Sequence, residues 1–111
     1  MPRPAPHRFV QIQTTLDDRD QAGSMIREAV EQRLAACGQL LGPLQSTYWW
    51  KGRIESAAEW MCVFKTTSAR AAALNQWILE VHPYEVPEIV TLEISAVSSA
   101  YGEWIENETS E

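Results

Sequence analysis

The chain has 111 residues, 45% of them apolar, and a formal net charge of −6 at pH 7. This length and composition predict one folded domain and argue against a disordered chain. The acidic balance disfavours binding to the phosphate backbone of nucleic acids, and no apolar run is long enough to span a bilayer. We therefore expect neither nucleic acid nor membrane as a partner.

The ends of the chain and its two cysteines indicate where the protein resides. Residues 1–8 contain three prolines and two arginines and lack the apolar stretch of a signal peptide, so we expect a flexible tail. Cys37 and Cys62 lie in apolar runs and form no C-x-x-C pair, which is typical of buried, reduced thiols. These features predict a cytoplasmic protein.

The first third of the chain is predicted to form a strand and a helix. Residues 9–15 alternate, with Val10 among the side chains of one face, as in a short strand. Asp17 and Asp18 provide the acidic groups that begin a helix. Apolar residues at helical spacing continue as far as Cys37, so we expect about five turns, ended by Gly38 in a left-handed conformation.

A long hairpin is predicted next. Residues 39–50 are β-like, with a Gly42-Pro43 interruption that indicates an edge strand or a bulge. Lys51-Gly52 is a turn signal, and residues 53–67 form the return strand. Both arms exceed the usual strand length, so we expect the projecting part to pair with another subunit.

The last third completes a β-α-β-β-α-β order. Thr67-Ser68 begins a helix that His82-Pro83 ends, because the residue before proline avoids the helical region. Residues 90–96 alternate as a strand, Ser98-Ser99 opens a short helix, and residues 107–111 are a polar tail. This order predicts an α+β, ferredoxin-like (split β-α-β) domain over residues 9–106, with an antiparallel sheet and both helices on one face.

Several motifs together resemble those of the CutA family, the divalent-cation tolerance proteins. The resemblance covers residues 9–106 and is carried by Arg33-Leu34-Ala35-Ala36-Cys37, Ser46-x-Tyr48-x-Trp50-x-Gly52-x-Ile54-Glu55, Glu59, Lys65-Thr66-Thr67, His82-Pro83-Tyr84-Glu85-Val86-Pro87-Glu88-Ile89 and Tyr101-x-x-Trp104. It implies a homotrimer like that of the PII proteins, in which long hairpin strands pair across subunits. It also implies a role in tolerance of divalent metal ions, copper in particular.

Three functions remain open at this point. The first is a non-enzymatic trimer that binds a metal or a small anionic ligand and requires no cofactor. The second is an enzyme, or a PII-like sensor of small molecules, with its site in the cleft between subunits. The third is an assembly protein without a ligand.

His82 and Glu85 are the candidate metal ligands, because a neutral imidazole suits copper and a carboxylate supplies an oxygen. The resemblance implies a copper site made of a first-strand cysteine, a histidine matching His82 and a second histidine just before it. Here Val81 fills the place of that second histidine, and the first strand has no cysteine. The alternative is that His82 caps the C-terminus of a helix, where positive charge is favoured.

The candidate ligand cleft consists of Trp50, Lys65, Thr66 and Tyr84. A lysine followed by hydroxyl groups at a helix start can hold a phosphate or carboxylate. The alternative is a helix cap beside a solvated lysine, and the Gly-rich approach of a P-loop is missing. PII-like trimers place ligands in clefts between subunits, which is an analogy of fold.

Other conspicuous side chains are interpreted as structural. Cys37 is expected to be a small buried residue at a helix end. Glu55 and Glu59 are expected on the hairpin surface or as cross-strand partners. Trp49 and Trp50 point to opposite faces of one strand, so we expect one in the core and the other at an interface or cleft wall.

Overall fold

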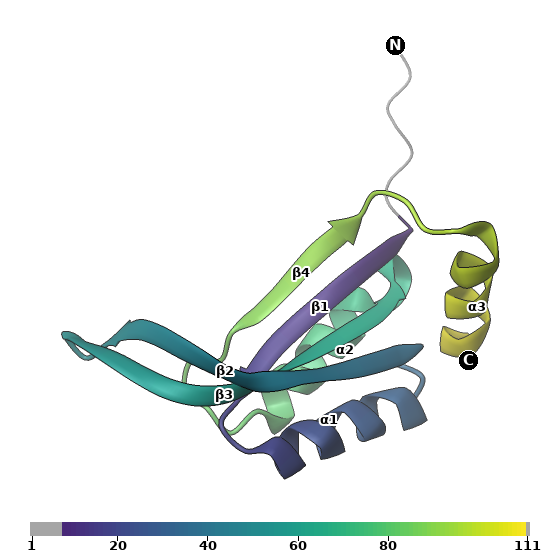
Figure 1. The fold of residues 1–111 in the computed structure, drawn as a ribbon. Coiled ribbons are helices and arrows are strands. Elements are labelled where there is room, and N and C mark those ends of the chain that lie inside the picture. Colours follow the sequence, from purple (N-terminus) through teal and green to yellow (C-terminus); the bar gives the residue numbers. More distant parts are fainter. Residues whose placement is uncertain (1–7, 111) are drawn as a thin grey trace.

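The computed structural model describes residues 8–110, so the predicted N-terminal tail, apart from Arg8, lies outside the described part. The described chain follows the predicted order of strands and helices and ends in a further helix (Figure 1). The elements are β1 (Phe9–Leu16), α1 (Arg19–Glu31), β2 (Cys37–Trp50), β3 (Arg53–Thr67), α2 (Ser68–Val81), β4 (Ile89–Ile94) and α3 (Ser99–Thr109).

The four strands form one sheet in the order β2-β3-β1-β4, and every neighbouring pair is antiparallel. Alternate residues of β1 and β3, among them Ile12 and Phe64, join a core with Met25 of α1 and Leu74 and Ile78 of α2. Both helices therefore cover the same face of the sheet. The predicted α+β, ferredoxin-like fold is confirmed.

Three local predictions about chain reversal and capping are also confirmed. Asp18 caps α1 by accepting a hydrogen bond from the amide of Gln21, and Thr67 caps α2 in the same way. Lys51 and Gly52 have φ of 51° and 79°, so both central residues of the hairpin turn are left-handed, as a two-residue turn of this hand requires.

The first helix is shorter than predicted. It ends at Glu31, and Arg33, with φ of 59°, takes the left-handed conformation that we expected of Gly38. Cys37 begins β2 instead of ending the helix and is half-buried. Gly38 is required for another reason, because a Cβ atom there would lie 2.5 Å from the side chain of Ile26. The apolar spacing continued past the helix because the following loop is itself buried.

Helix α3 packs at the end of the sheet that lies farthest from the hairpin turn (Figure 1). Gly102 fits against the ring of Phe9, and the hydroxyl of Tyr101 lies 3.4 Å from the thiol of Cys37. The helix continues to Thr109, which is buried and donates a hydrogen bond to a main-chain carbonyl. Helix α3 therefore includes residues 107–109, which were predicted to belong to the polar tail.

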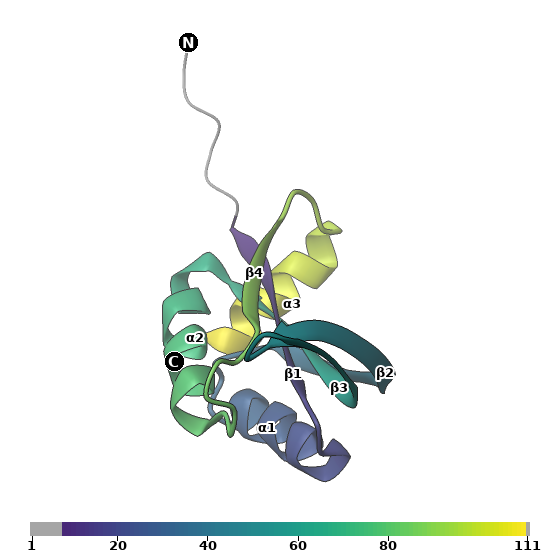
Figure 2. The ribbon, with the colours of Figure 1, turned by 90° about the vertical axis from the view of Figure 1, so that its left-hand side faces the viewer.

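The hairpin extends well beyond the rest of the sheet. Strand β1 ends opposite Trp60, so among the described residues 44–50 and 53–59 pair only with each other. A bulge between Leu41 and Leu44, at the predicted Gly42-Pro43 interruption, marks where this two-stranded part begins. Figure 2 views the molecule from the side of the turn and shows the hairpin standing clear of the helices. The scaffold thus carries a projecting ribbon about 23 Å long.

Candidate functional site

A hydrogen-bonded network lies where the hairpin leaves the sheet. His82, the residue that ends α2, is buried, and its Nε2 lies 3.0 Å from the main-chain oxygen of Thr15 at the end of β1. The amide of Tyr84 donates a hydrogen bond of 3.1 Å to Nδ1 of His82. The hydroxyl of Tyr84 donates a bond of 2.6 Å to the carboxylate of Glu59 on β3. The network ties the loop after α2 to both central strands.

The partners of His82 determine its tautomer. A main-chain amide can only donate and a carbonyl can only accept, so Nδ1 carries the lone pair and Nε2 carries the proton. Burial lowers the pKa of His82, although the bond to Thr15 and the charges of Glu59 and Asp17 oppose the shift. His82 occupies the C-cap position of α2, as expected. Its imidazole is neutral, however, so it does not supply the positive charge expected at the helix end.

Tyr84 is held in its protonated form. Burial raises its pKa, and the hydrogen bond to Glu59 and the negative charge of that carboxylate raise it further. Its ring meets the ring of His82 edge to face at a centroid separation of 4.8 Å. Tyr84 therefore acts as a hydrogen-bond donor toward Glu59.

Glu59 was expected on the hairpin surface or as a cross-strand partner. The surface placement is wrong, because only 6% of the residue is exposed, and the residue opposite it on β2 is Leu44. Glu55, four residues earlier, is exposed as expected. The signal in the sequence was weak: Glu59 immediately precedes the apolar run that starts at Trp60, where a carboxylate on a covered strand needs a partner. That partner, Tyr84, comes from a loop 25 positions away and could not be found from spacing.

The four residues of the predicted cleft do not meet within one chain. Lys65 lies six residues along β3 from Glu59, which is about 20 Å. Trp50 pairs with Arg53 near the hairpin turn, about 20 Å from Glu59 in the other direction. A site that uses Trp50, Lys65 and Tyr84 together therefore needs more than one copy of the chain.

Two of these side chains have partners inside the fold. Thr66 is fully buried and its hydroxyl donates a hydrogen bond of 2.7 Å to the carbonyl oxygen of Leu34. Lys65 donates a bond of 3.1 Å to the side-chain oxygen of Gln39. Thr66 therefore fixes the loop after α1, whereas Lys65 remains on the sheet face that α1 and α2 leave uncovered.

The geometry of the predicted metal ligands differs from that of a coordination site. Both ring nitrogens of His82 make hydrogen bonds, so a metal would have to displace one of them. Glu85 is exposed in the loop after α2. Within residues 8–110, no group of three or more His, Cys, Asp or Glu side chains could hold a metal ion.

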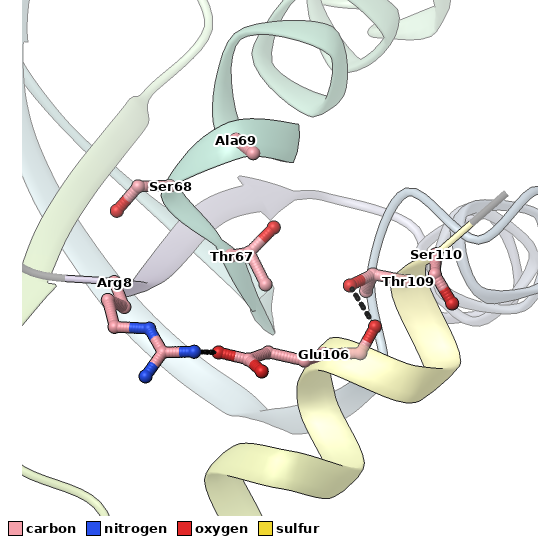
Figure 3. Close-up of a pocket in the computed structure, with 7 residues that line it drawn as sticks. All are labelled: Arg8, Thr67, Ser68, Ala69, Glu106, Thr109 and Ser110. Carbon is pink, nitrogen blue, oxygen red and sulfur yellow. Dashed lines mark hydrogen bonds and ion pairs between the residues drawn. The ribbon is translucent and has the colours of Figure 1, made fainter.

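A pocket of about 450 Å³ lies elsewhere, between the start of α2 and α3 (Figure 3). It is lined by Arg8, Thr67, Ser68, Ala69, Glu106, Thr109 and Ser110. Arg8 and Glu106 form an ion pair across it, and the hydroxyl of Thr109 is bonded to the main chain of α3. The pocket contains none of the predicted cleft residues, and the ion pair across it links α3 to the rest of the domain.

Comparison with known proteins gives the family. Residues 10–108 match the family model described as CutA1 divalent ion tolerance protein. The chain belongs to this family. The divalent-cation tolerance protein CutA of Thermotoga maritima is 34% identical over 97 residues, which cover 87% of this chain and 95% of that protein. The human protein CutA is 39% identical over 88 residues, covering 79% of this chain and 49% of that one.

Solved CutA structures share the fold over nearly the whole chain. CutA from Synechococcus elongatus superposes with a TM-score of 0.90 at 36% identity, covering 94% of this chain and 92% of that one. CutA1 from Shewanella sp. SIB1 gives a TM-score of 0.91 at 30% identity, covering 96% and 99%. The predicted family is thus confirmed. The chain nevertheless spans only about half the length of the human and mouse relatives. None of the helices described in this chain is long and apolar enough to cross a membrane.

Proposed function

We propose that this CutA-family protein is a cytoplasmic homotrimer of PII-like form that contributes to divalent-cation tolerance by binding a metal ion or a small anionic ligand between subunits. The observation that carries the proposal is the projecting half of the hairpin, residues 44–50 and 53–59. A two-stranded ribbon alone in water is marginally stable at best, so a ribbon of this length needs a covering surface.

The side chains of the projecting ribbon support the need for a partner. Trp49 is 72% exposed, Ile54 opposite it is 64% exposed, and Tyr48 is 42% exposed. The prediction that either Trp49 or Trp50 lies in the core of the chain is wrong, because both are exposed. Aromatic side chains gathered in this way are typical of protein interfaces. We interpret their exposure as the free surface of one subunit.

The sheet also has two open edges that could close a ring. Strand β2 lies at one edge and β4 at the other, and each has an unpaired outer side among the described residues. If β2 of one copy pairs with β4 of the next, the two copies make a head-to-tail contact. Such contacts form a closed ring when the rotation that relates neighbouring copies brings the last copy back to the first. A third copy would complete the ring in the PII-like arrangement.

Assembly would also complete the candidate ligand site. Lys65 lies about 20 Å along β3 from Glu59, the hydrogen-bond partner of Tyr84, whereas a neighbouring hairpin could bring Trp50 of one copy to Tyr84 of another. The Lys65 ammonium group suits an anionic ligand, whereas the hydroxyl proton of Tyr84 is already donated to Glu59. An enzyme in the same cleft is the alternative, and it requires turnover that is lost when Lys65 or Tyr84 is substituted.

Thermal unfolding with added probes tests the ligand. A compound that binds only the native protein must raise the melting temperature. We expect phosphate, citrate or Cu²⁺ to raise it, and Lys65→Ala to abolish the rise for the anions. If none of these probes raises the melting temperature, the ligand part of the proposal fails and the assembly protein without a ligand is favoured.

Copper titration followed by calorimetry tests the metal directly. His82→Ala should abolish stoichiometric Cu²⁺ binding if His82 is a ligand, whereas Glu85→Ala should weaken it. Glu80→Ala, an exposed carboxylate on α2, is the matched control. Unchanged binding by the His82→Ala protein would exclude His82 as a ligand, and the absence of stoichiometric binding by the parent would exclude copper.

Hydrogen exchange tests the covering of the ribbon. In the assembled protein, amides of residues 44–50 and 53–59 should exchange as slowly as those of the central sheet. Exchange at the rate of a frayed hairpin would show that nothing covers the ribbon.

A further inference from the structure

The projecting hairpin ends in a positively charged tip. Lys51 and Arg53 flank Gly52 at the turn, and both are exposed. The ammonium group of Lys51 lies 5.6 Å from the centre of the Trp50 ring, and Arg53 makes no ion pair within residues 8–110. We call residues 50–53 the hairpin tip.

The loop between α2 and β4 carries the opposite charge. Glu85 and Glu88 are both exposed in it, and Glu85 also lacks an ion pair within the described part of the chain. Glu59 adds negative charge close by, since its carboxylate accepts the hydrogen bond from the hydroxyl of Tyr84. His82 is held neutral by its hydrogen bonds and offsets none of it. We call residues 83–88 the acidic loop.

The direction of the strands links these two surfaces. Suppose that the outer side of β2 in one copy pairs antiparallel with the outer side of β4 in the next, in the register that sets Trp50 opposite Ile89, the first residue of β4. Six residues, 45–50, then span the six of β4, and the hairpin tip lies against the acidic loop that precedes Ile89. The same register places Trp49 beside Val90, which is 36% exposed. A parallel pairing would instead bring the tip to the other end of β4, away from the acidic loop.

We infer that the hairpin tip of one copy docks on the acidic loop of a neighbouring copy, with Lys51 and Arg53 facing Glu85 and Glu88. This inference rests on the proposed assembly and adds its polarity: each copy gives its basic tip to one neighbour and receives the tip of the other. Complementary charges at the rim of an interface fix the register and disfavour incorrect pairings. The contact also brings Trp50 of one copy toward Tyr84 of the next.

Charge reversal tests this contact. One variant carries Lys51→Glu and Arg53→Glu, a second carries Glu85→Lys and Glu88→Lys, and a third combines all four substitutions. The control, Arg19→Glu with Glu28→Lys, reverses two exposed charges on α1. The concentration at which the assembly dissociates is measured for the full chain by light scattering, in urea if the parent is too tight, and at two salt concentrations.

At low salt, the assemblies of the first two variants should dissociate at protein concentrations about tenfold or more above that of the parent, because each variant places like charges together. The combined variant should recover most of the loss, and high salt should reduce the differences. The inference is overturned if the tip variant and the loop variant dissociate at the same concentration as the control. It is also overturned if the combined variant dissociates as readily as either of them. A parent that is monomeric at all concentrations removes the proposed assembly itself, which is a separate result.

Discussion

Replacing Tyr84 by Phe removes one hydroxyl and leaves the rest of the ring in place. That hydroxyl is the hydrogen-bond donor to Glu59, at 2.6 Å, and Glu59 is only 6% exposed. Among residues 8–110, no second hydrogen bond reaches this carboxylate. The substitution therefore leaves a nearly buried charged group without its partner.

The expected cost follows from the type of bond. Hydrogen bonds to charged groups contribute about 1.5–3 kcal/mol, and Tyr84 is only partly buried, so water can replace some of the interaction. We expect Tyr84→Phe to lower the free energy of unfolding by about 1.5–2 kcal/mol. Urea unfolding at one fixed protein concentration, followed by circular dichroism, measures this loss.

Tyr48→Phe is the matched control. Tyr48 lies on the same hairpin and is 42% exposed, and its hydroxyl makes no hydrogen bond within the described residues. Because Phe keeps the ring that a neighbouring copy would cover and removes only this hydroxyl, the control should change stability by less than about 0.5 kcal/mol. Glu59→Gln with and without Tyr84→Phe completes a double-mutant cycle. Equal losses for Tyr84→Phe and Tyr48→Phe would refute the importance of the Glu59 contact.

Three further predictions follow from buried groups and close contacts. Thr14→Val should stabilise the protein by about 1 kcal/mol, because the Thr14 hydroxyl is buried without a hydrogen-bond partner within residues 8–110. Thr66→Val should destabilise it by about the same amount, because the Thr66 hydroxyl donates a buried hydrogen bond to the carbonyl of Leu34. The same urea assay measures both. Gly38→Ala should lower the stability by about 1–3 kcal/mol, because its methyl group would clash with α1. Gly23→Ala should raise the stability by about 0.5–1 kcal/mol, because Gly23 lies in α1 with open space around it. Thermal unfolding measures both changes. Folding lowers the pKa of His82, so its contribution to stability is complete above pH 6.5 and is lost as the pH falls toward the pKa of the folded state. The free energy of unfolding, measured from pH 7 to 4, should therefore fall with pH, and His82→Ala should reduce this dependence.

Features of the fold that depend on a few neighbouring residues could be predicted from the sequence. The hairpin turn needs two left-handed residues, and Lys51-Gly52 supplies them. Asp18 and Thr67 begin helices because their side chains reach amides three residues along. The predicted alternation of β1 is present, with Val10 on its buried face. Each of these outcomes is determined by local geometry and hydrophobic period.

Features that depend on distant contacts could not be predicted. The end of α1 was misplaced because the loop before Cys37 is buried by packing against other elements, which extends an apolar pattern past the helix. The burial of Glu59 depends on Tyr84 from a loop that folds back onto β3. The exposure of Trp49 and Trp50 follows from the projection of the hairpin beyond the end of β1, where no other described element covers these side chains.

Mass in solution tests the central claim most directly. Light scattering of the full chain at micromolar concentration should give three times the 12.6 kDa of one chain, since in the proposed assembly neighbouring copies cover the projecting hairpin and pair with the two open sheet edges. A mass of one chain at that concentration would contradict the trimer, the intersubunit ligand site and the proposed docking of the hairpin tip together.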